Sequence, residues 1–167
     1  MSRTRVRVLM ICMGNICRSP TAAAVLRERL RSAGLDDLVE VDSAGTHADW
    51  HAGEGADPRA HRHALSRGYD LSAHRARLLV RPDFERHDLI LAMDDDNLST
   101  LESRCPPAQR AKLRRLGEFG PRATGAVIPD PYYGGPAAFE QVLDLVENAC
   151  DGLLDELRRR LATPRPQ

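Results

Sequence analysis

This chain of 167 residues has no formal net charge and almost no lysine. Lys112 is the only lysine, and the 24 basic side chains are balanced by 24 acidic ones, which leaves a formal net charge of zero. This balance argues against nucleic acid or a membrane surface as a partner. The excess of arginine fits the recognition of anions by planar guanidinium groups, and it fits an arginine-rich coding bias equally well.

Long hydrophobic runs and closely paired cysteines are missing too. No stretch approaches the roughly 20 apolar residues that span a bilayer, and residues 8–12, after a basic start, are too few for the core of a signal peptide. We therefore expect a cytoplasmic protein whose thiols stay reduced. The four cysteines, at positions 12, 17, 105 and 150, form no C-x2-C pair, so they indicate reactivity or packing and no zinc site. A nucleotide loop of the form G-x4-G-K-S/T is absent as well.

Hydrophobic patterning predicts one α/β domain over residues 1–167, with a tail that frays from about residue 162. Strands that alternate with helices indicate a mostly parallel sheet covered on both faces. The predicted strands are 5–11, 39–41 with an end at 43–45, 88–93 and, more weakly, 113–119. The predicted helices are 20–33 with Ser19 as N-cap, 58–67, 95–103 and 136–161.

The segment CMGNICRSP, residues 12–20, carries the first chemical signal. A Cys-x5-Arg pattern alone is expected about 0.5 times by chance in a chain of this composition. Here it joins a predicted strand to the start of a predicted helix, where backbone N–H groups and the helix dipole bind anions. Gly14 and Asn15 can bend such a loop into a nest of amides, and Arg18 adds a bidentate fork. The same environment favours the thiolate of Cys12, which is a nucleophile.

The segment IPDPYYGG, residues 128–135, carries the second signal. Two prolines stiffen the loop around Asp130, and Tyr132 and Tyr133 follow at once. A carboxyl group held beside aromatic side chains suits a general acid that acts on an aromatic leaving group. Alone this segment is an ordinary turn, and its pairing with a nucleophilic anion-binding loop favours the functional interpretation.

Metal chemistry is not supported by the remaining candidates. MDDDNLST, residues 93–100, resembles the D-x-D-x-T/V pattern of metal-dependent phosphotransferases, but Leu98 occupies the position that needs Thr or Val. Acidic residues that open a helix explain this run. The histidines at 47, 51, 61 and 63 are irregularly placed along the chain, which favours solvent exposure over a metal site. Trp50, the only tryptophan, is expected either to pack in a loop or to line a pocket.

Together these segments resemble the low-molecular-weight protein tyrosine phosphatases. The matching segments are CMGNICRSP, VDSAGT, HRAR from His74, LAMD ending at Asp94, and DPYYG before the last helix. They occur in the order of the family and span about residues 5 to 160. The resemblance implies an α/β three-layer sandwich, with a four-stranded parallel sheet and helices on both faces. It also implies hydrolysis of phosphotyrosine through a phosphocysteine, with no cofactor and no metal.

The resemblance further implies a role for each matched residue. Cys12 is the nucleophile, Arg18 clamps the phosphate, and Asp130 acts as general acid and then as base. Ser19 hydrogen-bonds the thiolate, while Asn15, Ser43 and His74 brace the loop. The residues expected around the substrate are Met13, Gly14, Asn15, Ile16, Cys17, Ser19, Trp50, Tyr132 and Tyr133.

Two alternatives and one question about Cys17 stay open. A thioredoxin-coupled arsenate reductase shares the Cys-x5-Arg loop, but it needs further cysteines closely spaced on a mobile segment, and Cys105 and Cys150 are isolated. A non-catalytic phosphotyrosine-binding module needs neither nucleophile nor acid. Cys17 is either a partner for a protective disulfide with Cys12 or a small buried residue.

Several partners are implied by the resemblance. These are phosphotyrosine proteins, a bacterial tyrosine kinase if the source is bacterial, and phosphate-like anions in the loop. No nucleic acid and no membrane is expected.

Overall fold

Four parallel strands form the centre of the computed structural model, which describes residues 3–120 and 127–163. The strands are β1 (Val6–Cys12), β2 (Val39–Gly45), β3 (Leu89–Ala92) and β4 (Leu113–Arg115). They pair in the order β2-β1-β3-β4, so β1 lies inside the sheet with a neighbour on each side. Because the strands are parallel, their carboxyl ends meet at one edge, where ligands bind in open α/β sheets.

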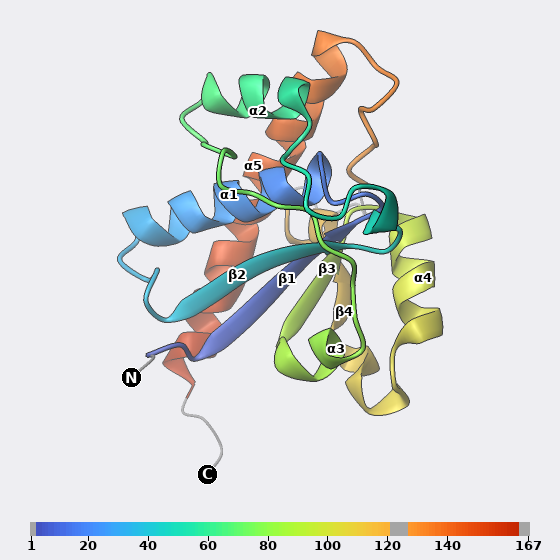
Figure 1. The fold of residues 1–167 in the computed structure, drawn as a ribbon. Helices are drawn as coiled ribbons and strands as arrows, with labels where there is room; N and C mark the ends of the chain where they lie inside the picture. Colours follow the sequence, from blue (N-terminus) through green and yellow to red (C-terminus); the bar gives the residue numbers. More distant parts are fainter. Residues whose placement is uncertain (1–2, 121–126, 164–167) are drawn as a thin grey trace.

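Helices cover both faces of this sheet. The α-helices are α1 (Arg18–Ser32), α2 (Pro58–Leu65), α3 (Pro82–Arg86), α4 (Asp95–Arg104) and α5 (Pro136–Ala162). Three short 3₁₀ helices are η1 (Ala48–Trp50), η2 (Pro107–Lys112) and η3 (Leu116–Phe119). Figure 1 shows the sheet between α1 and α5 on one side and α4 on the other. The predicted three-layer α/β sandwich is confirmed.

Two hydrophobic clusters fix β1 between the layers. Val8 and Met10 pack into the larger cluster with the apolar faces of α1, α2 and α5. Leu9 and Ile11 point the other way, into a cluster that includes Phe84 of α3 and Leu101 of α4. These four side chains of β1 are fully buried at 0% exposure, which is the pattern of a strand covered on both faces. The carboxyl end of β1 is therefore a rigid support.

Some element boundaries differ from those that the sequence predicts. The first helix begins at Arg18 with Cys17 at its N-cap, so Ser19 lies inside the helix and its hydroxyl bonds to side chains of the preceding loop. The fourth strand ends at Arg115, and the residues after it form η3. Helix α3 was not predicted. The predicted frayed tail lies mostly outside the described residues, since α5 continues to Ala162.

Gly152 allows α5 to pack closely against η3. A Cβ atom at this position would lie 1.6 Å from the carbonyl oxygen of Phe119 and 2.7 Å from its carbonyl carbon. Backbone atoms cannot rotate away as a flexible side chain can. The close approach of α5 to η3 therefore depends on a residue without a side chain.

We predict that Gly152→Ala destabilises the protein although alanine is the better helix former. The gain in helix propensity is about 1 kcal/mol, and overpacking a well-packed core costs about 1–3 kcal/mol, so the overlap with Phe119 makes the change unfavourable. Urea unfolding followed by circular dichroism measures the difference. Gly55→Ala is the control, because its added methyl group meets its nearest atoms at 3.6 Å or more, which is ordinary van der Waals contact. A Gly152→Ala protein as stable as the wild type would contradict the packing argument.

Candidate active site

Residues 12–18 curl into a loop between the end of β1 and the start of α1. Asn15 has a positive φ of 58°, which turns the chain where an extended loop would run straight. The loop is packed against β2, because a Cβ atom at Gly45 would lie 2.6 Å from the carbonyl oxygen of Met13. Backbone hydrogen bonds from Thr46 to Cys12 and from Asp57 to Ile16 hold the outer side.

The side chain of Asn15 braces this loop from behind. Its Nδ2 donates to Ser19 Oγ at 2.8 Å and to Ser43 Oγ at 3.0 Å, and its Oδ1 accepts from the backbone N–H of Arg77 at 2.9 Å. Because Ser19 Oγ accepts from Asn15, its own hydrogen is free for Cys12 Sγ, which lies 3.0 Å away. Ser19 can therefore act as a hydrogen-bond donor toward the sulfur.

His74 completes the bracing from the segment between α2 and α3. Its Nε2 lies 2.6 Å from the carbonyl oxygen of Asn15. A carbonyl oxygen only accepts, so Nε2 carries the proton. Burial lowers the pKa of His74, although the hydrogen bond to Asn15 acts in the opposite direction. The imidazole is therefore neutral near pH 7.

Arg18 is a nearly buried cation, only 3% exposed, at the first position of α1. One terminal nitrogen donates to Asp94 Oδ2 at 2.6 Å and to the carbonyl oxygen of Ile128 at 3.0 Å. Asp94 follows β3 and also caps α4 by accepting from the N–H of Asn97. The other terminal nitrogen lies 3.8 Å from Asp130 Oδ2. The guanidinium is thus held on one edge and available for an anion on the other.

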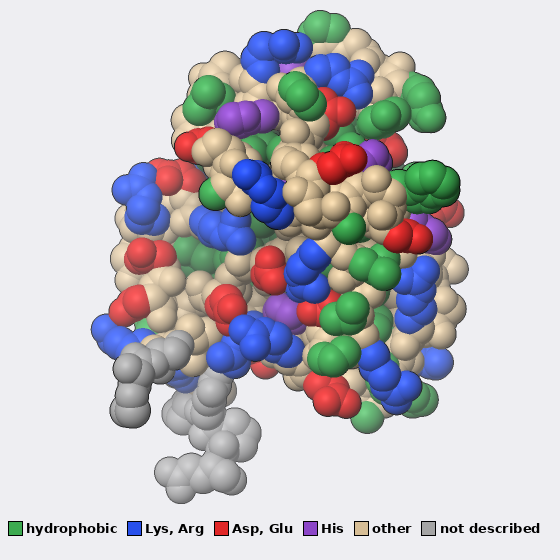
Figure 2. Space-filling view, viewed as in Figure 1, with side chains coloured by type: hydrophobic (Ala, Val, Ile, Leu, Met, Phe, Trp, Pro, Cys, Tyr) green, Lys and Arg blue, Asp and Glu red, His purple; other side chains and the backbone are tan. Residues whose placement is uncertain are grey.

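Asp130 lies on the loop that leads into α5. Its Oδ1 accepts from the backbone N–H of Tyr132 at 3.0 Å, and its side chain is 44% exposed. The exposed aromatic side chains Tyr132 and Tyr133 follow it. Figure 2 shows hydrophobic side chains on the surface over η1 and over the segment that leads into α5.

A cavity of about 250 Å³ unites most of the predicted residues. Cys12, Arg18 and Asp130 all line it, together with Met13, Gly14, Ile16, Cys17, Tyr132, Tyr133 and His51. Asn15 and Ser19, predicted to lie around the substrate, are fully buried behind the loop instead. Trp50 does not line this cavity, and at 86% exposure it is no packing residue either.

Two site residues were missed by the sequence analysis. His51 lines the cavity, and its Nδ1 lies 2.9 Å from Glu54 Oε2. Asp94 is the partner of Arg18, and its position directly after the third predicted strand was the available signal. In residues 3–120 and 127–163, no group of three or more His, Cys, Asp or Glu side chains is arranged to hold a metal ion.

The remaining three cysteines, Cys17, Cys105 and Cys150, are buried. Burial, with a further contribution from Asp57, raises the pKa of the Cys17 thiol. Burial also raises the pKa of Cys105 and of Cys150, which belong to the two opposite core clusters. All four cysteines are free thiols. These three side chains are therefore poor nucleophiles at neutral pH.

Comparison with known proteins gives a consistent result. Residues 7–163 match the family described as "Low molecular weight phosphotyrosine protein phosphatase". A low molecular weight protein-tyrosine-phosphatase from Streptomyces coelicolor is 47% identical over 159 residues, which cover 93% of this chain and 95% of the relative.

Solved structures are similar as well. The crystal structure of a protein tyrosine phosphatase from Entamoeba histolytica, with Hepes in the active site, has a TM-score of 0.89 at 38% identity and covers 94% of this chain and 99% of that one. Vibrio vulnificus Wzb in complex with benzylphosphonate has a TM-score of 0.79 at 29% identity, with coverage of 90% and 98%.

We predict that the His74 ring titrates below about pH 6.5, the value of an unperturbed histidine. The folded protein then binds fewer protons at this site than the unfolded chain as the pH falls through 6.5. His74 therefore contributes stability that is fully present above about pH 6.5 and is lost as the pH falls toward its folded pKa. NMR titration of the ring, assigned with His74→Gln, measures the midpoint. A midpoint at or above 6.5 would show that burial does not dominate.

Proposed function

The chain belongs to the low molecular weight phosphotyrosine protein phosphatase family, and we propose that Cys12, Arg18 and Asp130 carry out its reaction. It is an enzyme that hydrolyses phosphotyrosine. The observation that carries the assignment of these residues is their convergence on one cavity from two segments of the chain, the loop of residues 12–18 and the loop that leads into α5. Nucleophile, cation and acid are then all within reach of one phosphoryl group.

In the first step, Cys12 Sγ attacks phosphorus while the bond from phosphorus to the phenolic oxygen breaks. Ser19 donates a hydrogen bond to the thiolate and lowers the energy of the attacking form. Asp130 gives its proton to the departing oxygen, so tyrosine leaves as a neutral phenol. The backbone N–H groups of the loop and the free edge of Arg18 stabilise the equatorial oxygens. The product is a phosphocysteine.

In the second step, water attacks phosphorus and the bond from sulfur to phosphorus breaks. The Asp130 carboxylate, which has lost its proton in the first step, accepts a proton from this water. Inorganic phosphate is released and the thiolate of Cys12 is restored. Arg18 acts in both steps because Asp94 and the Ile128 carbonyl hold its guanidinium in place throughout.

The arsenate reductase alternative is less well supported. A thiol relay requires a second reactive cysteine that reaches the nucleophile, whereas Cys105 and Cys150 are buried in the core. Cys17 lines the cavity, but its raised pKa keeps it a thiol. The binding-module alternative leaves the placement of Asp130 beside Arg18 without a purpose.

The lining of the cavity extends this proposal to the class of substrate. Tyr132 and Tyr133 offer aromatic surface at the cavity, which favours an aromatic phosphate ester over phosphoserine. The Vibrio vulnificus relative in complex with benzylphosphonate supports an aromatic group next to the phosphoryl position.

None of the helices in the described part of the chain is long and apolar enough to cross a bilayer. A reducing cytoplasm would keep Cys12 active, and a bacterial tyrosine kinase would be a suitable partner there.

We predict that Cys12→Ser abolishes the hydrolysis of p-nitrophenyl phosphate but keeps the binding of inorganic phosphate. The hydroxyl is a far weaker nucleophile, whereas the backbone amides and Arg18 are unchanged. Arg18→Lys is expected to lose both the hydrolysis and the binding of phosphate, because a point charge cannot replace a planar fork held by Asp94. Steady-state kinetics and calorimetric phosphate binding measure the two properties. Substantial turnover by Cys12→Ser would refute the assignment of the nucleophile.

We predict that the effect of Asp130→Asn depends on the leaving group. Phenyl phosphate releases a phenol of pKa near 10, so its kcat/KM should fall by about 100- to 10,000-fold, as is typical of lost general acid catalysis. An ester of a much more acidic phenol should be affected far less. Plots of log kcat/KM against leaving-group pKa measure the slope, and exposed Asp96→Asn is the control. If the plots for wild type and Asp130→Asn are parallel, the acid lies elsewhere.

A further inference from the structure

We propose that Arg59 is a positioning residue for catalysis, because it holds the loop that carries Asp130 in its place over the cavity. The inference rests on the proposed role of Asp130 as general acid and goes beyond it. Arg59 lies in the first turn of α2 and does not line the cavity itself.

Arg59 is fixed at one end by Asp57, the N-cap of α2. Asp57 Oδ1 accepts from the backbone N–H of Arg59 at 2.8 Å and from its Nε at 3.2 Å, and Oδ2 accepts from a terminal nitrogen at 3.0 Å. Burial alone would raise the pKa of Asp57, but the bonds from Arg59 outweigh it and lower this pKa. The carboxylate therefore stays charged, and two side-chain bonds set the plane of the guanidinium.

The guanidinium of Arg59 lies against two aromatic rings. Its central carbon is 5.3 Å from the centre of the Tyr132 ring and 4.8 Å from that of Phe139 in the first turn of α5. Both distances are within the range of cation–π contacts. Tyr132 is two residues from Asp130, and its N–H donates to the Asp130 carboxylate. A shift of Tyr132 therefore shifts the acid.

Apart from the buried side chain of Pro131, the other described contacts of this loop leave its tip weakly held. Ile128 is fixed by its N–H to the Met93 carbonyl and by its own carbonyl to Arg18. Beyond it, the 3.8 Å between Asp130 and Arg18 is too long for a hydrogen bond. Tyr133 packs edge-on against Tyr132, but it is 97% exposed and offers no anchor. The Arg59 contact therefore links the tip to α2, in addition to the burial of Pro131.

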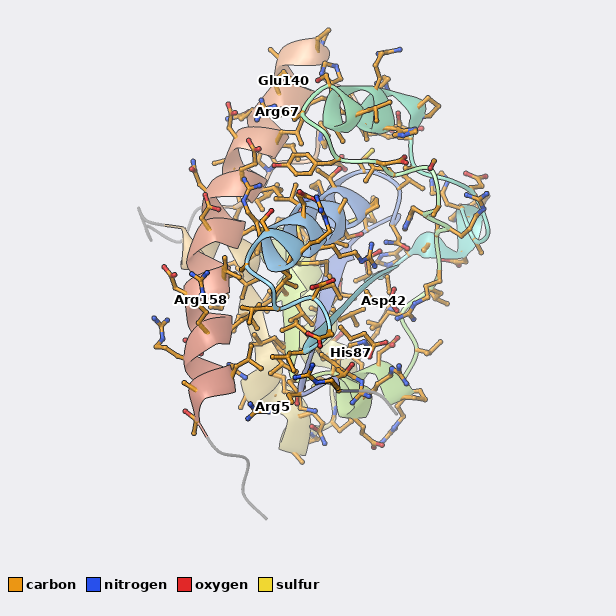
Figure 3. All side chains as sticks on the ribbon, turned by 90° about the vertical axis from the view of Figure 1, so that its left-hand side faces the viewer. Arg5, Asp42, Arg67, His87, Glu140 and Arg158 are labelled. Carbon is orange, nitrogen blue, oxygen red and sulfur yellow. The ribbon has the colours of Figure 1, made fainter. Side chains whose placement is uncertain are left out.

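Helix α2 is itself tied to the nucleophile loop and to α5. The N–H of Asp57 donates to the carbonyl of Ile16 at 2.8 Å. Beyond the other end of the helix, Arg67 donates to Glu140 of α5 at 2.8 Å, and Figure 3 shows these two side chains facing one another. Arg59 therefore connects the loop that carries Asp130 to a helix that is itself hydrogen-bonded to the loop that carries Cys12. A displacement of the order of 1 Å costs up to about 100-fold in rate.

The test compares leaving groups in Arg59→Ala. The kcat/KM for phenyl phosphate is expected to fall by about tenfold, and that for an ester of a strongly acidic phenol by less than about twofold, because only the first needs the proton. Arg59→Lys should also steepen the plot of log kcat/KM against leaving-group pKa, since lysine cannot form two hydrogen bonds to Asp57 and lie flat against both rings. It retains the charge and the methylene stem, so it serves if Arg59→Ala fails to fold. Arg62→Ala, an exposed arginine on the same helix, is the matched control.

A double-mutant cycle separates this inference from the proposed function. In an Asp130→Asn background, Arg59→Ala should add no further change in slope, because the acid is already gone. If Asp130→Asn steepens the plot and the Arg59 variants keep the wild-type slope, the positioning role is overturned while the acid stands. If Asp130→Asn itself keeps the wild-type slope, the proposed acid fails and this inference fails with it. An equal loss for both esters in the folded Arg59 variants would show a merely structural role and would also overturn the inference.

Discussion

The carboxamide of Asn15 joins three separate segments of the chain, and the shape of the cavity depends on this junction. It bonds to Ser19 in α1, to Ser43 in β2 and to the backbone of Arg77. The residue adopts a left-handed backbone that costs most L residues about 1–2 kcal/mol. Glycine would accept that backbone without making the bonds, and longer polar side chains would not fit the fully buried space. Asparagine meets both requirements at once.

The buried charge of Arg18 is stabilised by partners that leave one edge of its guanidinium available to an anion. A nearly buried guanidinium without partners would be very unfavourable. Asp94 and a carbonyl oxygen supply hydrogen bonds to one edge, and the other edge has only the longer ion pair with Asp130. Asp94 comes from the carboxyl end of β3, which pairs with β1 in the sheet. The parallel register thus brings the anion-binding loop and its counter-charge together. Hydrophobic packing on both faces of β1 keeps this arrangement rigid.

Local patterns in the sequence predicted the parts of this structure that depend on neighbouring residues. The strand, loop and helix around Cys12 and the long final helix followed from periodicity and from turn residues. Contacts between distant residues could not be read in this way: Arg18 and Asp94 are 76 positions apart. Helix α3 has five residues, too few for a period to emerge. His51 looked like any loop histidine, because nothing local shows that η1 turns it toward the cavity.

The single tryptophan has a consequence for the spectroscopy of this protein. Trp50 ends η1 and is 86% exposed in the folded state, so its indole already lies in water before the chain unfolds. Its fluorescence should change little on denaturation. A buried indole would report the loss of the core, and this exposed one does not. The intrinsic tryptophan fluorescence is therefore a poor measure of unfolding for this protein, whereas the circular dichroism of its helices follows the loss of the fold directly.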